Sequence, residues 1–209
     1  STNDPLREAI NLPKGAVFRR CALQVNPSTY AATYRGKGNS GDPKTYAKKL
    51  LEKASKLEIS VIAVTDHNHV GGIPVLREEA EKRKIHLFPG FELTSSEGIH
   101  VICLYSPNTD QATLERFLGE FGIRDTGPHA GLAKSSFTEI LACVREQEGL
   151  TIAAHATSDN GLFKVLDGQA RINAWKSKDL LAIQIPGPME NLPSGMRPIV
   201  ENKNPEYER

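Results

Sequence analysis

The sequence predicts an α/β protein in which most strands are parallel. Short apolar runs rich in β-branched residues, such as 59–65, alternate with amphipathic segments along almost the whole chain of 209 residues. Six candidate strands mostly separated by candidate helices fit either an open doubly wound sheet or a barrel. Neither of the two glycine-rich phosphate-binding fingerprints, GxGxxG and GxxxxGK[ST], is present, which weakens the nucleotide-binding doubly wound alternative.

The first half of the chain is expected to hold two strands separated by a loop and a helix, followed by a second helix. The strands are recognised by apolar alternation or by a continuous β-branched run, and the first helix by proline in its first turn. The second helix carries acids early and bases late, as the helix dipole favours. In order, we expect a strand over 18–25, a Gly-, Ser- and Asn-rich loop over 27–42, a helix over 43–57, a strand over 59–65 and a helix over 75–84.

The second half is expected to begin with a hairpin, because the link at 95–98 is too short for a parallel crossover. Beyond residue 186 the chain is rich in proline, asparagine and charge, which predicts a surface tail or linker. The expected domain is therefore 1–187, and residues 188–209 form a tail or linker toward a further domain. The expected elements are strands over 86–91 and 99–105, helices over 114–121 and 137–148, a strand over 150–154, a weakly signalled helix over 163–175 and a last strand over 180–185.

Composition excludes several classes of protein. The chain is 39% hydrophobic and 24% charged, which is ordinary for a globular protein and too apolar for disorder. The longest apolar runs are far shorter than the roughly 18 residues that a membrane span needs, so no membrane partner is expected. The net charge of +1 gives no sign of a polyanionic partner, although a local basic patch stays open.

Three cysteines, Cys21, Cys103 and Cys143, lie in apolar stretches. An odd number of cysteines without a pairing pattern favours a reducing compartment, so we expect the protein in the cytoplasm. We interpret all three as small core residues, with a reactive thiol as the alternative. The chain has no CxxC pair and no GxSxG motif, so neither a zinc knuckle nor a serine nucleophile elbow is indicated.

Histidines and carboxylates gather at the ends of the predicted strands. Asp66 and His67 follow the strand over 59–65, Glu92 follows the next strand, His100 opens the hairpin's second strand, and His155 follows the strand over 150–154. Imidazole and carboxylate are the ligands that zinc, manganese and iron take in proteins. A central carboxylate can also bridge two ions. The pattern therefore predicts a metal site.

Each of these residues also has an ordinary structural explanation. A histidine at a strand end is often only hydrogen-bonded or solvated, and we interpret His86 and His129 in this way. Asp66 could serve as a turn or helix-cap residue. Glu92 directly follows an apolar strand and lies opposite His100 in a tight hairpin, so it needs a partner if it is buried. The combined presence of such residues at four strand ends favours the metal site.

Three motifs resemble those of the PHP (polymerase and histidinol phosphatase) superfamily. They are TDHN at 65–68 after an apolar strand, GFELT at 90–94 with His100 downstream, and AAH at 153–155. The resemblance runs over about 18–185. It implies a distorted seven-stranded (βα) barrel that hydrolyses phosphate esters, phosphodiesters among them, with two or three metal ions, usually zinc or manganese.

The resemblance also implies roles for individual residues. Glu92 would be the bridging carboxylate, and His100 and His155 would complete the ligands of one ion. His67 would serve a separate ion, with Asp66 as a further ligand beside it. On this basis Asp66, His67 and Glu92 are the expected catalytic residues.

Two departures from the family pattern affect the expected metal site. The family's first motif is His-x-His, and this chain has Gln24-Val25-Asn26, whose neutral amide oxygens bind transition metals more weakly. The family's closing Asp-x-His is missing, since no histidine follows His155. A seventh strand would be expected after Ile185, so the barrel is expected to be incomplete at its C-terminal end.

The sequence around Gln24 and the tail at 201–209 most resemble PHP domains that open larger proteins carrying an SMC- or ABC-type ATPase module. This similarity implies that the 209 residues are the amino-terminal part of a longer polypeptide. It also implies an ATPase module in the same chain or in a partner chain.

Three functions follow as hypotheses. The first is a metal-dependent phosphoesterase, with nucleic acid as the expected substrate and with Arg35 and Lys37 gripping it, unless these two simply belong to a solvated loop. The second is a degenerate barrel with a regulatory or assembly role beside an ATPase. The third is a small-molecule phosphatase, which the sequence does not separate from a nuclease.

Overall fold

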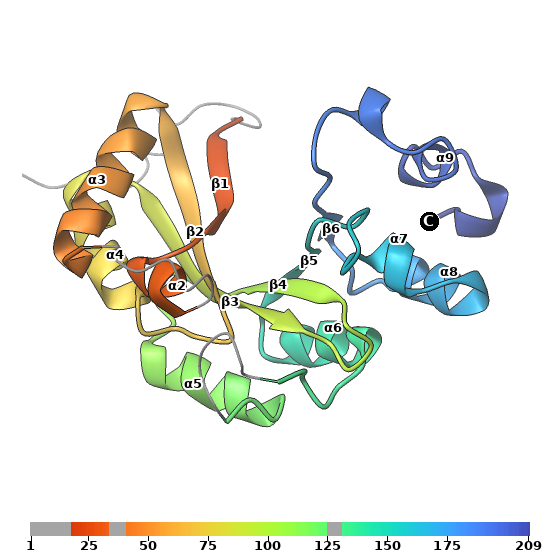
Figure 1. The fold of residues 1–209 in the computed structure, drawn as a ribbon, viewed down its shortest axis with the longest axis horizontal. Helices are drawn as coiled ribbons and strands as arrows, with labels where there is room; N and C mark the ends of the chain where they lie inside the picture. Colours follow the sequence, from red (N-terminus) through yellow and green to blue (C-terminus); the bar gives the residue numbers. More distant parts are fainter. Residues whose placement is uncertain (1–17, 34–40, 125–130) are drawn as a thin grey trace, which may run out of the picture.

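The computed structural model describes residues 18–33, 41–124 and 131–209. These residues form a mixed six-stranded sheet whose strands follow one another in chain order and whose surface curls into a half-barrel (Figure 1). The predicted α/β class is confirmed, and the sheet matches part of the predicted barrel. The strands are β1 (Arg20–Val25), β2 (Ile59–His67), β3 (His86–Thr94), β4 (His100–Leu104), β5 (Leu150–Ala153) and β6 (Ala182–Ile183).

One strand of the sheet, β4, runs against the direction of the other five. β1, β2 and β3 are parallel, β4 is antiparallel to both β3 and β5, and β6 is parallel to β5. The predicted hairpin at 95–98 is therefore confirmed. It places the start of β4 at the same edge of the sheet as the carboxyl ends of the parallel strands.

The principal helices pack against the convex face of the sheet. Three of the four N-termini are capped by side chains that accept backbone N–H groups, as in the capping box of Ser136 and Glu139 and the cap that Asp42 provides. The helix that begins at Ile73 follows Gly72 and has no side-chain cap. The helices predicted over 43–57, 75–84, 114–121 and 137–148 are confirmed with shifted ends. They are α3 (Pro43–Lys56), α4 (Ile73–Lys82), α5 (Gln111–Glu120) and α6 (Phe137–Glu146).

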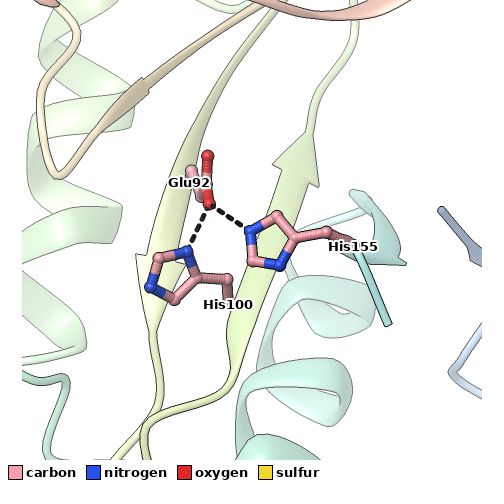
Figure 2. A group of neighbouring side chains, drawn as sticks. All are labelled: Glu92, His100 and His155. Atoms are coloured by element: carbon pink, nitrogen blue, oxygen red, sulfur yellow. Dashed lines mark hydrogen bonds and ion pairs between the residues drawn. The ribbon is translucent and has the colours of Figure 1, made fainter. Parts of the chain in front are cut away.

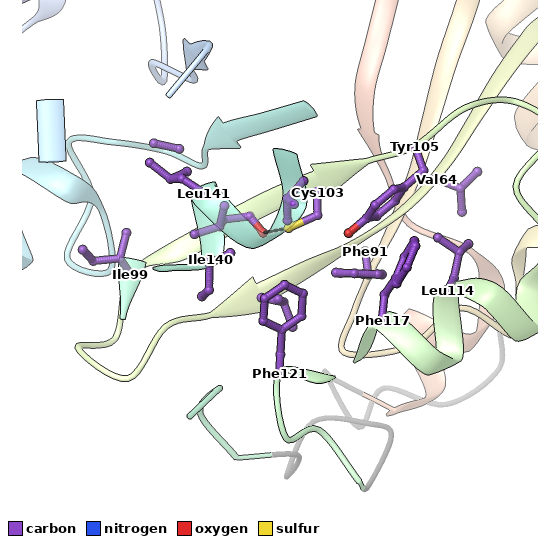
Figure 3. Packing of buried hydrophobic residues seen from close by; sticks show 14 of the residues in the cluster. Val64, Phe91, Ile99, Cys103, Tyr105, Leu114, Phe117, Phe121, Ile140 and Leu141 are labelled. Atoms are coloured by element: carbon purple, nitrogen blue, oxygen red, sulfur yellow. Dashed lines mark hydrogen bonds between the residues drawn. The ribbon is translucent and has the colours of Figure 1, made fainter. Parts of the chain in front are cut away.

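The main core lies between this convex face and the helices (Figure 3). Phe91 of β3 packs against Tyr105, with ring centroids 5.5 Å apart, and Tyr105 packs against Phe117 of α5 at 5.0 Å. Burying a side chain of this size stabilises the fold by about 1.5–3 kcal/mol. The core thus holds β3 and β4, the strands that carry the site, against α5 and α6.

The concave face carries a smaller apolar cluster of its own, formed by Ala63, Ile102, Leu104 and Ala154. Successive side chains of a strand point to opposite faces, so Ile102 shares its face with His100, and Ala63 shares its face with His67. The polar residues at the strand ends therefore lie above an apolar floor, as in enzymes built on (βα) barrels.

Three predicted elements differ in detail. The loop predicted over 27–42 contains a short helix, α2 (Ser28–Thr33), whose first turn is closed by the Tyr30 N–H donating to the Pro27 carbonyl. The helix predicted over 163–175 is broken into α7 (Leu162–Val165) and α8 (Gly168–Lys176), because Leu166 is extended. The strand predicted over 180–185 is only two residues long, since β5 offers it only two pairing positions.

The residues after Pro186 are more ordered than the predicted surface tail. They form η1 (Met189–Asn191), α9 (Arg197–Val200) and η2 (Pro205–Tyr207). Tyr207 is buried against α8, where the Trp175 indole N–H donates to its carbonyl at 2.9 Å and Arg171 Nε donates to its hydroxyl at 2.9 Å. The buried side chain of Tyr207 explains why the C-terminal residues pack against α8. The proposed boundary near residue 187 stays a prediction.

The cysteines differ in burial, and all three are free. Cys103 is buried, as predicted, and Cys143 is half-buried. The prediction of a core position is wrong for Cys21, which is exposed because β1 is an edge strand paired only with β2. Among the residues that the structure describes, no helix is long and apolar enough to cross a membrane.

Candidate metal centre

The β3–β4 hairpin brings Glu92 and His100 together. Its register pairs Thr94 with His100, so Glu92, two residues before Thr94, lies diagonally opposite the histidine on the concave face. Ser95 closes the turn, since its N–H donates to the Ile99 carbonyl at 2.8 Å and its hydroxyl accepts the Ile99 N–H at 3.1 Å. His100 Nδ1 lies 2.7 Å from Glu92 Oε1 (Figure 2).

His155 approaches the same carboxylate from the end of β5. Its Nε2 lies 3.6 Å from Glu92 Oε1, and its ring centroid lies 4.9 Å from that of His100 (Figure 2). His155 has φ +29°, a left-handed conformation that is uncommon for residues other than glycine. Its backbone N–H donates to Gln184 Oε1 at 2.9 Å, which helps to hold the turn.

The three side chains can act as a metal-binding group. One ligand atom from each of Glu92, His100 and His155 lies within 4.8 Å of the other two. His155 Nδ1 is buried and has no hydrogen-bond partner among the described residues. A carboxylate with two imidazoles is a donor set that zinc and manganese accept, so the residues fit the predicted cofactor.

These residues face a cavity of about 310 Å³ at the mouth of the half-barrel. Its walls combine the candidate ligands with neutral polar groups, which suits a charged ligand better than an apolar one. The lining residues are Gln24, Asn26, Tyr30, His67, Glu92, His100 and His155.

The charge of Glu92 is strongly stabilised. Burial alone would raise the pKa of its carboxyl group, but hydrogen bonds with His100 and Gln24 and the nearby imidazole of His155 outweigh it and lower the pKa to about 2. Burial lowers the pKa of His67, and the nearby charges of Glu92 and Asp66 offset this only in part. The site therefore combines an anionic carboxylate with a neutral imidazole at pH 7.

His67 lines the cavity beside the three-residue group. The β2–β3 register pairs it with Glu92, and its ring centroid lies 5.3 Å from that of His100. Its Nε2 lies 2.9 Å from the Thr94 hydroxyl. The residue lies where the sequence predicts, close to the candidate ligands but with one ring nitrogen hydrogen-bonded to Thr94.

Asp66 is not brought to the cavity. As the neighbour of His67 on β2, it points to the opposite face of the sheet. There its Oδ2 accepts from the Thr29 hydroxyl at 2.7 Å and lies 3.2 Å from His69 Nδ1, while its Oδ1 accepts the His67 N–H at 2.9 Å. Asp66 thus forms a separate buried cluster with Thr29 and His69.

The amides predicted as weaker ligands behave differently from each other. Gln24 donates from Nε2 to Glu92 Oε2 at 2.7 Å, and its oxygen accepts from Gln184 Nε2 at 3.0 Å. Asn26 lines the cavity, and its Oδ1 is buried with no hydrogen-bond partner within the described ranges. Arg35 and Lys37, the predicted substrate-binding residues, lie outside the described residues.

Sequence reasoning did not select several residues that contact the candidate ligands. Asn160 Nδ2 lies 3.1 Å from His100 Nε2, Thr94 bonds to His67, and Gln184 bonds to both Gln24 and His155. Gln184 directly follows β6. It would have been a candidate if amides at strand ends had been considered together with carboxylates and imidazoles. Asn160 lies beyond the end of β5, and nothing in the nearby sequence marks it.

Comparison with known proteins supports the fold. No family model and no curated protein matches the sequence. A crystal structure of a metal-dependent phosphoesterase from Bifidobacterium adolescentis superposes with a TM-score of 0.55 at 15% identity, covering 86% of this chain and 80% of that one. The similarity shows a shared fold, a partial (βα) barrel of the kind that the PHP resemblance implies.

Two further structures share this fold. The lesion-specific endonuclease EndoQ from Pyrococcus furiosus has a TM-score of 0.54 at 13% identity, and this chain covers 40% of it. An Endonuclease Q complex with a 27-mer duplex carrying an abasic lesion has a TM-score of 0.50 at 16% identity and is covered over 41%. Each match covers 78% of this chain. The resemblance predicted from the motifs is therefore confirmed at the level of the fold.

Proposed function

We propose that this protein is a metal-dependent phosphoesterase of the PHP type. The observation that carries the proposal is the convergence of Glu92, His100 and His155 on one cavity at the mouth of the half-barrel. A divalent ion bound by these residues supplies Lewis-acid stabilisation of phosphate oxygens and makes a bound water more acidic. Zinc and manganese are the proposed ions, because they accept mixed carboxylate and imidazole ligands.

The remaining residues of the cavity have separate tasks under this proposal. Glu92 keeps its negative charge at neutral pH, since its pKa lies near 2. His67 is oriented by the Thr94 hydroxyl and stays neutral, so it can accept a proton or donate a hydrogen bond to a phosphate oxygen. Asp66 acts indirectly, because its Oδ1 accepts the His67 N–H and so fixes the backbone at that residue.

Nucleic acid is the proposed substrate. The support is the shared fold with Endonuclease Q, one structure of which holds a duplex substrate. A phosphodiester in DNA or RNA would present its anionic oxygens to the cavity. A small-molecule phosphate ester is the competing substrate, and single- and double-stranded oligonucleotides compared with simple phosphomonoesters distinguish the two.

Metal analysis combined with a phosphodiesterase assay tests the proposal. The purified protein is expected to retain zinc or manganese and to cleave bis(p-nitrophenyl) phosphate or an oligonucleotide. Glu92→Ala should lose both metal and activity, whereas Glu115→Ala on the exposed face of α5 should keep both. Absence of bound metal together with full activity of Glu92→Ala would rule the proposal out.

A regulatory or assembly role is the second candidate, and Gln24 favours it. A glutamine stands where the PHP pattern has a histidine, and its amide nitrogen, which cannot bind a cation, faces Glu92. Under this alternative the protein binds its partner without turnover in zinc or manganese. Metal-dependent cleavage that Glu92→Ala abolishes would exclude it.

The link to an ATPase module and the cytoplasmic location complete the proposal. The first rests on the resemblance of the sequence around Gln24 and of residues 201–209 to PHP domains that precede SMC- or ABC-type ATPases, and the second on three free cysteines. ATP hydrolysis by the full-length polypeptide or by a co-purifying chain tests the link. Fractionation of cells tests the location.

A further inference from the structure

Three hydrogen bonds connect the two ends of the sheet through a pair of glutamines. The backbone N–H of His155 donates to Gln184 Oε1 at 2.9 Å, Gln184 Nε2 donates to Gln24 Oε1 at 3.0 Å, and Gln24 Nε2 donates to Glu92 Oε2 at 2.7 Å. We call Gln184 and Gln24 the amide relay. It joins two of the candidate metal ligands, His155 and Glu92, across residues that are 160 positions apart in the sequence.

The direction of the amide relay is fixed at its start. An amide side chain can rotate to exchange its oxygen and nitrogen, but a backbone N–H can only donate. Gln184 must therefore present its oxygen to His155, which leaves its nitrogen for Gln24. Gln24 in turn must present its oxygen to Gln184 and its nitrogen to Glu92. Reversing Gln24 alone would set two donors against each other and two oxygens against each other.

The two oxygens of Glu92 consequently have different surroundings. Oε1 lies 2.7 Å from His100 Nδ1 and 3.6 Å from His155 Nε2, in the group that can hold an ion. Oε2 faces the Gln24 amide hydrogens. An N–H donor satisfies a carboxylate oxygen without a cation and cannot act as a metal ligand, so the amide relay occupies the side of Glu92 that a bridged second ion would need.

Three of the residues expected around a second ion are also turned to different partners, and what Asn26 leaves at the cavity is a neutral amide oxygen, a weak ligand for transition metals. Asp66 lies on the opposite face of β2, with Thr29 and His69. His67 bonds through Nε2 to the Thr94 hydroxyl. Gln24 itself offers nitrogen where an oxygen ligand would be required.

We propose that the site holds one divalent ion, bound by Glu92, His100 and His155, and that the amide relay sets this number. The inference rests on the proposed function and deepens it. Gln24 and Gln184 are positioning residues: they orient the Glu92 carboxylate and hold the backbone of His155, without binding the ion themselves. Removal of positioning groups of this kind typically lowers metal affinity by about 10–100-fold.

Metal stoichiometry of the wild-type protein is the first measurement. Isothermal titration of the metal-free protein with Zn²⁺ or Mn²⁺, checked by elemental analysis after dialysis, should give one ion per chain. Two or more ions per chain would overturn the inference and leave the phosphoesterase proposal intact. No bound ion would overturn both.

Gln184→Glu tests whether the amide relay sets the number. The substitution replaces the Nε2 donor with an acceptor, so Gln24 should turn its nitrogen to the new carboxylate and its oxygen to Glu92. A cation between the Gln24 oxygen and the Glu92 carboxylate would then be favoured, and we expect two ions per chain. Gln169→Glu on α8 is the matched control, since Gln169 is exposed and bonds only to Asn173 in the described structure; it should keep one ion.

Thermal unfolding shows whether Gln184→Glu is folded. Two more variants provide a test that does not depend on that substitution. Gln24→His offers an imidazole nitrogen to the second side of Glu92 and should also raise the stoichiometry to two. Gln184→Met removes both polar groups and should keep one ion while weakening its affinity about 10–100-fold. A stoichiometry of one in folded Gln184→Glu and Gln24→His, or unchanged affinity in Gln184→Met, would overturn the role of the amide relay.

Discussion

Glu92→Gln should remove a pH-dependent part of the stability of the metal-free protein. The substitution keeps the shape of the side chain but removes its charge. In the folded protein the pKa of Glu92 is lowered from 4.5 to about 2, because hydrogen bonds with His100 and Gln24 and the nearby imidazole of His155 outweigh the effect of burial. Since the folded pKa lies below the unfolded one, the carboxylate form stabilises the fold, and this stabilisation is fully present only above about pH 4.5.

The magnitude follows from the difference between the two pKa values. A lowering from 4.5 to about 2 corresponds to about 3 kcal/mol in the free energy of unfolding at neutral pH. As the pH falls from about 6 to about 3, about 2 kcal/mol of this contribution should be lost, and the rest below that. The Glu92 side chain is only 7% exposed, so solvent screening reduces these figures little.

Urea unfolding in the presence of a chelator measures the effect. The quantity of interest is the difference in unfolding free energy between the wild-type protein and Glu92→Gln, taken at several pH values from about 6 to about 3. Other acidic groups contribute equally to both proteins, so they cancel in this difference. Glu115→Gln, on the exposed face of α5, should differ from the wild type by less than about 0.5 kcal/mol at every pH.

A wild-type advantage that stays constant over this pH range would refute the reasoning. It would mean that Glu92 titrates at the same pH in the folded and unfolded proteins, and hence that the contacts with His100, His155 and Gln24 do not stabilise its charge. An advantage that grows as the pH falls would refute it as well, because the sign of the linkage would be reversed.

Three further substitutions test the scaffold around the site. Gly90→Ala should destabilise the protein by about 1–3 kcal/mol in thermal unfolding, because the new Cβ would lie 2.1 Å from the Cys103 carbonyl oxygen on β4; an unchanged melting temperature would contradict the β3–β4 register. Ser136→Ala should cost about 1 kcal/mol, measured by urea unfolding, because it removes the N-cap of α6. Tyr207→Ala should shift the fluorescence of Trp175, the single tryptophan, to longer wavelength by loosening its cover; an unshifted spectrum would show that the C-terminal segment does not pack there.

The sequence predicted the strands of the sheet well but not where they end. The apolar runs at 59–65 and 86–91 mark β2 and β3, yet β2 continues to His67 and β3 to Thr94. The two extensions pair with each other, since His67 lies opposite Glu92 in the parallel ladder. Hydrophobic periodicity cannot detect them, because a polar side chain facing a cavity interrupts the apolar pattern while the backbone hydrogen bonds continue.

The candidate site was predictable as a set of residue types and not as a geometry. His67, Glu92, His100 and His155 all lie at the cavity, because β2, β3 and β5 end, and β4 begins, at the same edge of the sheet. Asp66 does not, since strand alternation sends it to the other face. Gln184 was not predicted because its role depends on the hydrogen bond with Gln24, 160 residues away in the sequence. This contact forms only because the sheet curls enough to bring these two residues together.

The reversal of β4 and the turn after β5 show how this fold collects ligands beyond those that parallel strands supply. Because β4 runs antiparallel, its first residue, His100, lies at the edge where β3 ends. His155 reaches the same point from a left-handed backbone conformation, which typically costs about 1–3 kcal/mol for a residue other than glycine. A glycine at this position would avoid the cost but would offer no imidazole to Glu92. The strain is therefore best understood as a consequence of placing a histidine there, sustained by the Gln184 hydrogen bond to its N–H.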